Sequence, residues 1–448
     1  MMPRYTPQEI GDVWTDKEKF QLWYVVEMAI IQARCELGLY PTEIYELIKK
    51  TASFTTTAIE KREEKIEHDL QAFVETLRET VTMALRRYIH DGVTSYDIED
   101  PALALMFLHA GRIIIDDLQR LITTLRLRAS EHMHTYCMGM THGRDAKPTP
   151  FGWRLCMYLE MMERGLKNFE YILEQVKEVK CSGATGNYAT ISPALESKVC
   201  GLLGLRVRPV ASQIVGRDVY ARALSEIAVI GGCLEKIAED LRLLSLSGID
   251  EIIEPKKTTS KGSSAMPQKV NPVKLEQISG LVRILRGNAL AMMETISTWL
   301  ERDIANSSVE RIVLADSTIL IDYLLISMEA IITGMTVRRE QMSVNIHRAC
   351  DTWAAEDVKI FLCGKELDPD AVYTFLQACA TKAHELKHNY KEVLLASIYL
   401  PKGAPLREII DPQELIGCFD FISKLRNLEE GYRRMNLDPK LALPSNIK

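Results

Sequence analysis

The sequence lacks a paired-cysteine motif. Its ten cysteines are scattered between positions 35 and 418, and none of them forms a C-x-x-C pair. Single scattered thiols are typical of a protein kept in a reducing compartment rather than of a disulfide framework. We therefore expect ten reduced thiols and a cytoplasmic location.

Long apolar runs and a strong charge imbalance are also missing. No stretch reaches the roughly 18 apolar residues of a membrane span, and the best candidate, 312–335, is interrupted by Asp316, Asp322 and Glu329. The opening segment MMPRYTPQEI lacks the apolar run of a secretion signal. The formal net charge is only −6, so nothing favours nucleic acid or an anionic membrane as a partner. We expect a soluble globular protein.

Apolar residues at helical spacing dominate the chain instead. Thr15 to Glu18 has the form of a capping box, and the helical run after it ends at Gly38. Residues 58–81 predict one or two helices, with a possible break at EHDLQ. Longer helical patterns follow at 97–134, 151–179, 218–246, 275–300 and 307–335. These patterns are at least twice as long as the usual helix of about 11 to 12 residues. Because such long helices depend on tertiary packing for their stability, we expect them to pack on one another.

Alternation of polar and apolar residues, which indicates strands, is almost absent. The best candidate, LRVRPVASQIV at 205–215, is weakened by Pro209. We predict an all-α fold in which a central bundle of long helices is flanked by two smaller helical domains. The predicted domains are 1–95, 96–350 and 351–448.

Polar segments interrupt the helical pattern in four places. They are EHDLQAF (67–73), HDGVTSYD (90–97), MTHGRDAKPTPFG (140–152) and SKGSSAMPQKVNP (260–272). The last is longer than the roughly two to eight residues that usually connect helices, so it is a lid, a binding loop or a linker. A single such histidine is more often a core residue than a catalyst, but four interruptions beside long helices favour a functional site.

The segment GSSAMPQKVNP (262–272) resembles the signature loop of the fumarase/aspartase superfamily. RYTPQEIGDVWTDKEKFQLW, EHDLQAF, HDGVTS, THG…KPTPFG, SGATGNYA, ASQIVGRD and ERDIANSSVER are similar to the members that cleave N-succinyl purine nucleotides. The similarity covers most of the first 311 residues and is looser after them. It implies elimination of fumarate from succinyl-AMP, and from the analogous succinyl-carboxamide ribotide, without a cofactor.

This elimination needs a positioned base, donors for the extra negative charge and an acid for the departing nitrogen. The resemblance implies Ser263 as the general base, on a loop that closes over the substrate. It implies His142 as the general acid, for which a pKa near neutrality is suitable. Lys269 would stabilise the carbanion, and Glu276 would orient His142.

The resemblance also implies a set of substrate-binding residues. They are Arg4, Tyr5, His68, Asp69, His90, Thr94, Ser95, Thr141, Gln213, Asn271, Arg302, Ser307 and Arg311. Met140, Arg144 and Asp91 differ from the residues common in related enzymes, and we expect Asp91 to weaken anion binding beside His90. The superfamily further implies a homotetramer with a twenty-helix core and active sites that each combine segments of three chains.

Other functions stay open at this point. The chain resembles, less closely, other fumarate-releasing lyases such as argininosuccinate lyase, and structural relatives that lost activity keep the same fold. HELKH (384–388) matches the H-E-x-x-H pattern of zinc metallopeptidases, in which two histidines share one helix face. No other part of the chain supports a peptidase, so we expect a solvated helix face and no metal.

Overall fold

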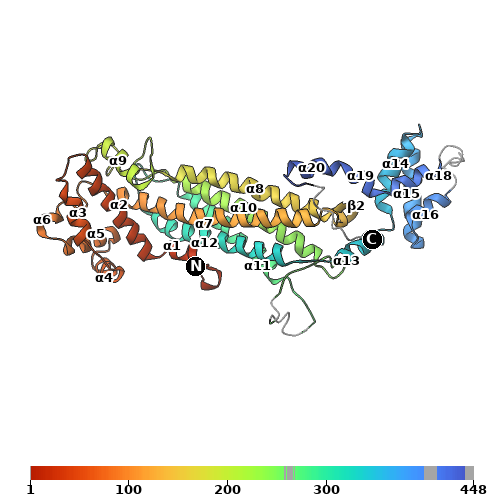
Figure 1. Ribbon diagram of the computed structural model, residues 1–448, viewed down its shortest axis with the longest axis horizontal. Coiled ribbons are helices and arrows are strands. Elements are labelled where there is room, and N and C mark those ends of the chain that lie inside the picture. Colours follow the sequence, from red (N-terminus) through yellow and green to blue (C-terminus); the bar gives the residue numbers. More distant parts are fainter. Residues whose placement is uncertain (1, 257–258, 260–265, 267, 398–410, 439–448) are drawn as a thin grey trace. The chain divides into compact units, whose positions relative to one another are not determined.

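The computed structural model describes residues 2–256, 259, 266, 268–397 and 411–438 (Figure 1). By its internal contacts the chain divides into two compact units, each assembled from three stretches. The first unit contains Met1–Leu121, Met162–Lys236 and Gln277–Met328. The second unit contains Ile122–Met161, Ile237–Glu276 and Glu329–Lys448. Helices dominate both, which confirms the predicted all-α class.

The N-terminal helices of the first unit form as the capping pattern predicts. Thr15 Oγ1 accepts a hydrogen bond from the Glu18 backbone N–H at 3.3 Å, where α2 (Asp16–Glu36) begins. The predicted break is confirmed: Glu67 adopts φ +52° and His68 caps the next helix. The other helices here are η1 (Pro3–Tyr5), α1 (Gln8–Val13), α3 (Glu43–Thr51), α4 (Thr56–Ile66), α5 (Asp69–Thr80), α6 (Met83–Arg86) and α9 (Pro193–Leu203).

Five long helices, of 22 to 37 residues, make up about a third of the chain. They are α7 (Ser95–Glu131), α8 (Phe151–Val176), α10 (Asp218–Leu244), α11 (Val273–Glu294) and α12 (Ala305–Gly334). Each end lies within three residues of its prediction except that of α11, which stops at 294 instead of 300. Small residues bring some of them close together: a Cβ on Gly111 of α7 would lie 2.7 Å from Leu173 of α8. The long helices run side by side (Figure 1).

The hairpin of β1 (Tyr136–Thr141) and β2 (Arg144–Pro150) was not predicted. Its sequence does not alternate, and Pro148 and Pro150 argue against a strand. Among the described residues, the other strands are two-residue pairs. β3 (Glu178–Val179) is parallel to β4 (Arg206–Val207), and β5 (Ile252–Ile253) is antiparallel to β6 (Thr336–Val337). The strand predicted within 205–215 is thus confirmed over two residues only.

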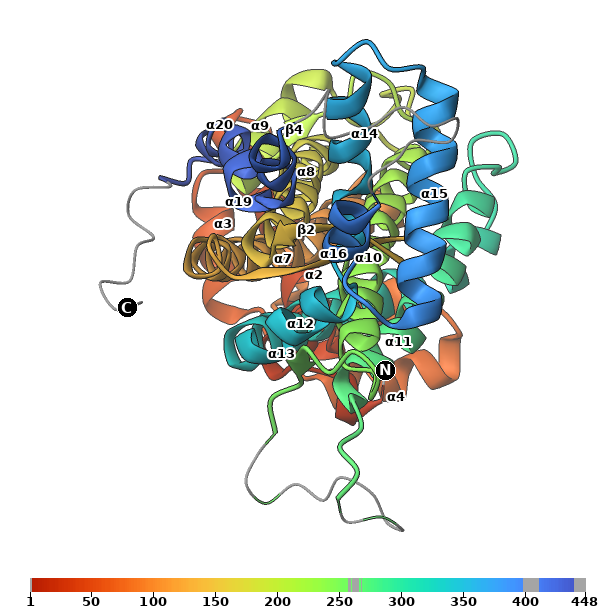
Figure 2. The same cartoon turned by 90° about the vertical axis from the view of Figure 1, so that its right-hand side faces the viewer.

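Short helices complete the second unit. They are α13 (Arg339–Arg348), η2 (Thr352–Ala354), α14 (Ala355–Cys363), α15 (Pro369–Leu386), α16 (Tyr390–Ala396), α18 (Pro412–Ile416), η3 (Gly417–Phe419), α19 (Phe421–Lys424), η4 (Leu425–Asn427) and α20 (Leu428–Arg434). Figure 2 shows α14, α15 and α16, whose buried Val358, Phe375 and Tyr390 share one apolar core. Within the described residues, no helix combines the length and apolarity needed to cross a membrane.

Candidate active site

One pocket in the first unit is lined by seven of the predicted substrate-binding residues. Its volume is about 750 Å³. The seven are His68, Asp69, Ser95, Gln213, Arg302, Ser307 and Arg311. They come from the start of α5, the start of α7, the segment before α10, the segment before α12 and the start of α12, which places distant parts of the sequence around one space.

Two arginines give this pocket its positive groups. Arg302 Nη1 donates to Gln213 Oε1 at 3.0 Å, and its guanidinium carbon lies 3.5 Å from the centroid of the Tyr96 ring. Arg311 Nη2 lies 2.5 Å from Asp69 Oδ2. A stacked planar guanidinium keeps a fixed orientation and can bind a carboxylate or phosphate through two parallel N–H groups. Arg302 is therefore preorganised for an anion.

A buried ion pair positions Gln213. Lys180 Nζ lies 2.6 Å from Asp97 Oδ1 and also donates to the Gln213 carbonyl oxygen at 3.0 Å, and both charged side chains are fully buried. Asp97 Oδ2 accepts a hydrogen bond from the Thr94 backbone N–H at 2.9 Å, which caps α7. Gln213 Nε2 in turn donates to the Ala184 carbonyl oxygen at 3.0 Å. Sequence reasoning missed Asp97 and Lys180 as positioning residues.

A glycine allows the two loop segments around Gln213 to approach each other. Gly186 has φ +73°, and a Cβ there would lie 2.1 Å from the Ala211 carbonyl oxygen. Only glycine tolerates both this backbone conformation and this distance. The segments SGATGNYA and ASQIVGRD, which the sequence linked only through a family resemblance, are thus in direct contact.

A second buried ion cluster joins α7 to α12. Arg217 Nη1 lies 2.8 Å from Asp100 Oδ1, and Arg217 Nε lies 2.7 Å from Glu310 Oε1. Asp100 Oδ2 also accepts from the Val215 backbone N–H at 2.7 Å. The guanidinium is fully buried, so its two carboxylate partners are required to offset the loss of hydration.

Glu99 is a further pocket residue that sequence reasoning missed. It lies on α7 four residues after Ser95, so the two side chains share a helix face. Burial raises the pKa of Glu99 to about 7, the Asp69 carboxylate adds to this rise, and Arg302 and Arg311 oppose it. A single glutamate within a helix belongs to no motif, so nothing in the sequence marked it.

The predicted residues His90, Thr94, Arg4 and Tyr5 are not among those that line this pocket. His90 has φ +56°, its backbone N–H donates to the buried Glu27, and its Nδ1 lies 3.3 Å from Glu27 Oε2. The Tyr5 ring packs edge-on against Tyr323, with centroids 5.2 Å apart. These residues have defined positions in the first unit, while their predicted contact with substrate stays a prediction.

Asp91 has a partner that the sequence did not suggest. Its Oδ2 lies 2.7 Å from Arg34 Nη1 and accepts a hydrogen bond from Tyr40 Oη at 2.7 Å. The Arg34 cation therefore offsets the negative charge of Asp91, which we expected to weaken anion binding beside His90.

In the second unit, His142 lies at the tip of the hairpin. Thr141 pairs with Arg144 across a two-residue turn in which His142 has φ +53° and Gly143 has φ +71°. Two positive φ angles are typical of a type I′ turn, whose twist matches the flanking strands. The turn leaves the His142 side chain exposed to solvent.

The residues before α11 form the second group of predicted site residues in this unit. Lys269 donates its backbone N–H to the Met266 carbonyl oxygen at 3.0 Å, Asn271 follows, and Glu276 is exposed in the first turn of α11. In the described part of this unit, neither the His142 ring nor the Glu276 carboxylate has a hydrogen-bond partner. The predicted general base Ser263, like the rest of 260–265, lies outside the described residues.

The H-E-x-x-H segment does not have the geometry of a zinc site. Helix α15 ends at Leu386, and Lys387 adopts φ +52°, so His388 lies beyond the helix that contains His384. The two rings therefore do not share one helical face. No cluster of three or more metal-binding side chains occurs within the described residues.

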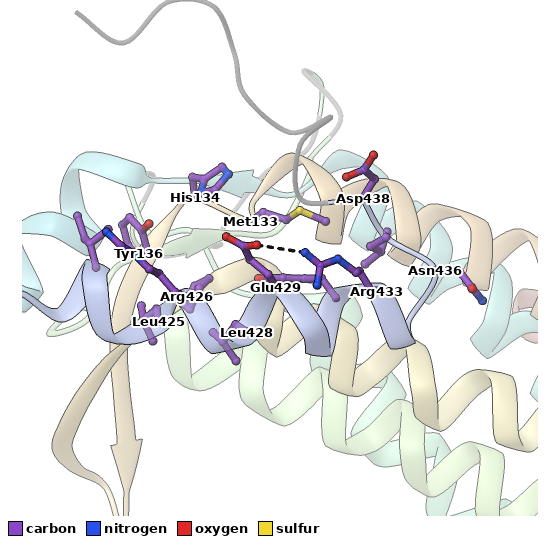
Figure 3. Close-up of a pocket in the computed structure, with 14 residues that line it drawn as sticks. Met133, His134, Tyr136, Leu425, Arg426, Leu428, Glu429, Arg433, Asn436 and Asp438 are labelled. Atoms are coloured by element: carbon purple, nitrogen blue, oxygen red, sulfur yellow. Dashed lines mark hydrogen bonds and ion pairs between the residues drawn. The ribbon is translucent and has the colours of Figure 1, made fainter.

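A larger pocket, of about 1130 Å³, lies in the second unit and contains none of the predicted site residues (Figure 3). Met133, His134 and Tyr136 line it together with α20, whose Arg433 and Glu429 are 3.3 Å apart. Arg433 is paired with Glu429 and Glu430, and Arg426 also lines this pocket, but no residue of the predicted site lies here.

Known proteins resemble this chain over nearly its whole length. A family model described as "Lyase" matches residues 3–287. A protein named adenylosuccinate lyase from Aquifex aeolicus (strain VF5) is 37% identical over 428 residues, which are 94% of this chain and 98% of that protein. Another of that name, from Bacillus subtilis (strain 168), is 34% identical and covers 98% and 100%.

A solved structure shares the fold as well. The crystal structure of a fumarate lyase from Mesorhizobium sp. BNC1 superposes with a TM-score of 0.84 at 22% identity, and the match covers 94% of this chain and 95% of that one. At 22% identity, this similarity shows only that the two proteins share a fold.

Proposed function

The chain belongs to the lyase family of the fumarase/aspartase superfamily, and we propose that it is a carbon–nitrogen lyase acting on N-succinyl purine nucleotides. The reaction converts succinyl-AMP to AMP and fumarate, and by analogy converts succinyl-carboxamide ribotide to its carboxamide, in cytoplasmic purine biosynthesis. The relatives named adenylosuccinate lyase support this choice over argininosuccinate cleavage or an inactive structural role.

The observation that carries the proposal is the pocket with Arg302, Arg311, Ser95 and Ser307. The two guanidinium groups suit the phosphate and the carboxylates of such a substrate, and the two hydroxyls add donors at the starts of α7 and α12. No cofactor is required, because the electrons of the broken C–H bond form the double bond of fumarate as the C–N bond breaks.

In the proposed mechanism, Ser263 removes the proton next to the succinyl carboxylate. Lys269 and Asn271 stabilise the carboxylate that gains negative charge, and His142 donates a proton to the departing purine nitrogen. Glu276 would orient the His142 ring. These are the roles that the motif implies, and each is open to mutational test.

Among the residues that the structure describes, the side chains of His142 and Glu276 are exposed and have no hydrogen-bond partner, which supports an active site that other chains complete. A ring at a hairpin tip can reach substrate bound to a neighbouring subunit without disturbing its own fold. We therefore propose a homotetramer whose sites combine the pocket of one chain with the hairpin and the signature loop of others.

The proposal is tested by ultraviolet absorbance with succinyl-AMP and, separately, argininosuccinate. Turnover of the first alone is expected, and a lack of turnover of any succinyl nucleotide would overturn the proposal. Ser263→Ala should lose about 10²-fold or more in kcat with an unchanged melting temperature, whereas the matched Ser264→Ala should stay active.

The shared site has a test of its own. Ser263→Ala and His142→Asn subunits, each inactive alone, are unfolded, mixed and refolded together. Mixed tetramers contain some sites with an intact serine and an intact histidine, so part of the activity should return. An inactive mixture that still forms tetramers would contradict sharing between chains.

A further inference from the structure

Glu99 lines the pocket of the first unit, and within the described residues its carboxyl group has no hydrogen-bond or ion-pair partner. It also lines a smaller cavity of about 380 Å³, which shares Glu63, Ser307 and Arg311 with the larger pocket. In the described part of the first unit, the Glu99 carboxyl group forms no hydrogen bond and no ion pair. Its charged neighbours act on it only through longer-range Coulomb interactions. An unpaired, partly buried acid that faces a cavity points to a ligand.

The neighbouring arginines do not neutralise Glu99 directly. Arg302 is bound to Gln213 Oε1 and stacked on the Tyr96 ring, while Arg311 is paired with Asp69. Among the described residues, neither guanidinium group forms a hydrogen bond or ion pair with Glu99, and Arg302 keeps a buried Nε–H without a partner.

Carboxylates outnumber cations around Glu99. The charged and titratable groups on the surrounding elements are Asp16, Lys19, Glu63, Glu67, His68, Asp69, Tyr96, Asp100, Arg217, Glu301, Arg302, Asp303, Glu310 and Arg311. Burial is the main cause that raises the pKa of Glu99 to about 7. The carboxylates of Asp69 and Asp100 add to the rise, and Arg302 and Arg311 oppose it.

We propose that Glu99 binds substrate as a neutral acid and donates a hydrogen bond from its carboxyl group to an anionic oxygen of the ligand. This inference rests on the proposed function. A phosphate or carboxylate drawn in by Arg302 and Arg311 would be repelled by an ionised Glu99, but it accepts a hydrogen bond from a protonated one. The bound anion further favours the protonated form, so binding above neutral pH takes up a proton.

Glu99→Gln separates this role from a simple change of charge. Glutamine keeps the size and an N–H donor but cannot ionise. Above pH 7 the affinity of the unaltered protein for substrate should fall by up to about tenfold per pH unit. In Glu99→Gln that fall should disappear, and binding at pH 8.5 should be tighter than in the unaltered protein. Glu63→Gln, which removes the same charge from the same two cavities, should keep the pH dependence.

The test is calorimetric titration of the intact protein and both variants with AMP and with fumarate between pH 7 and 9. Buffers of different ionisation enthalpy report the protons taken up. Proton uptake on binding AMP but not fumarate would show that Glu99 donates its hydrogen bond to the phosphate. Proton uptake on binding fumarate but not AMP would show that it donates to a carboxylate. In either case the uptake should be absent in Glu99→Gln.

Four outcomes would count against the inference. Unchanged proton uptake in Glu99→Gln would overturn it, and so would weaker binding of both ligands to this variant at every pH. If the unaltered protein still turned over succinyl-AMP, the proposed function would stand. Loss of the pH dependence in Glu63→Gln as well would show a general charge effect and overturn the specific role of Glu99. No turnover of any succinyl nucleotide by the unaltered protein would overturn the function and the inference together.

Discussion

Arg34 and Asp91 form an ion pair in the first unit, in which Arg34 Nη1 lies 2.7 Å from Asp91 Oδ2 and Nη2 donates to the Asp91 carbonyl oxygen at 2.5 Å. Arg34 is buried, whereas about half of the Asp91 side chain is exposed. The arginine therefore fixes both the charge and the backbone of the residue next to His90.

Replacing Arg34 with methionine should leave the Asp91 carboxylate unpaired and weaken the binding of an anionic substrate. We expect KM for succinyl-AMP to rise about fivefold, which corresponds to about 1 kcal/mol. The double variant Arg34→Met/Asp91→Asn should regain most of the loss, because it removes the unpaired charge. Steady-state kinetics will show this, and additive effects of the two changes would contradict it.

Arg302→Lys keeps the positive charge but removes the planar group that stacks on Tyr96 and binds Gln213. The KM for succinyl-AMP should rise about ten- to hundredfold, because lysine cannot make the two parallel hydrogen bonds to an anion. Arg283→Lys, at an exposed position on α11 outside the pocket lining, is the matched control. Similar KM values for both variants would show that charge alone is sufficient.

The buried cluster of Arg217, Asp100 and Glu310 should dominate the stability of the first unit. Arg217→Met leaves two buried carboxylates without a cation, and we expect a loss of about 3–5 kcal/mol in the free energy of unfolding. Arg222→Met removes an exposed pair with Asp218 at 3.6 Å and should lose less than about 1 kcal/mol. Urea unfolding at one protein concentration compares them, and equal losses would refute the importance of burial.

Asp322 gives the stability a dependence on pH. It is buried on α12, and burial raises its pKa to about 7, with Arg120 opposing and Glu9 adding to the rise. The folded state therefore holds a proton that the unfolded chain has lost between about pH 4 and pH 7, so stability falls as pH rises through this window. Asp322→Asn should melt at a higher temperature than the unaltered protein at pH 8, with a smaller difference at pH 4. Parallel melting curves at all pH values would exclude this role.

The periodicity of apolar residues predicted the helices well because each helix buries one face along its whole length. The spans of α7 and α10 and the break at Glu67 follow from local sequence. The hairpin that presents His142 could not be predicted in this way, because its strands neither alternate nor avoid proline.

The candidate site was predictable only where residues belong to motifs. Arg302, Arg311 and Gln213 were found through family resemblance, and the structure places them around one pocket. Asp97 with Lys180, and Arg34 with Asp91, pair across more than fifty positions, and such charges have no local pattern. Glu99 gains its unusual properties only from neighbours that folding brings close.

The assembly of each compact unit from three separated stretches has a consequence for protein synthesis. In the first unit, residues 1–121 pack with two later stretches of the chain, the last of which ends at Met328. The second unit begins at Ile122 and its last stretch ends at Lys448. A ribosome must therefore translate the chain as far as Met328 before the first unit can close its core, and further still for the second unit. Nascent chains expose apolar helix faces throughout that interval, so truncated products should aggregate instead of surviving as smaller folded proteins.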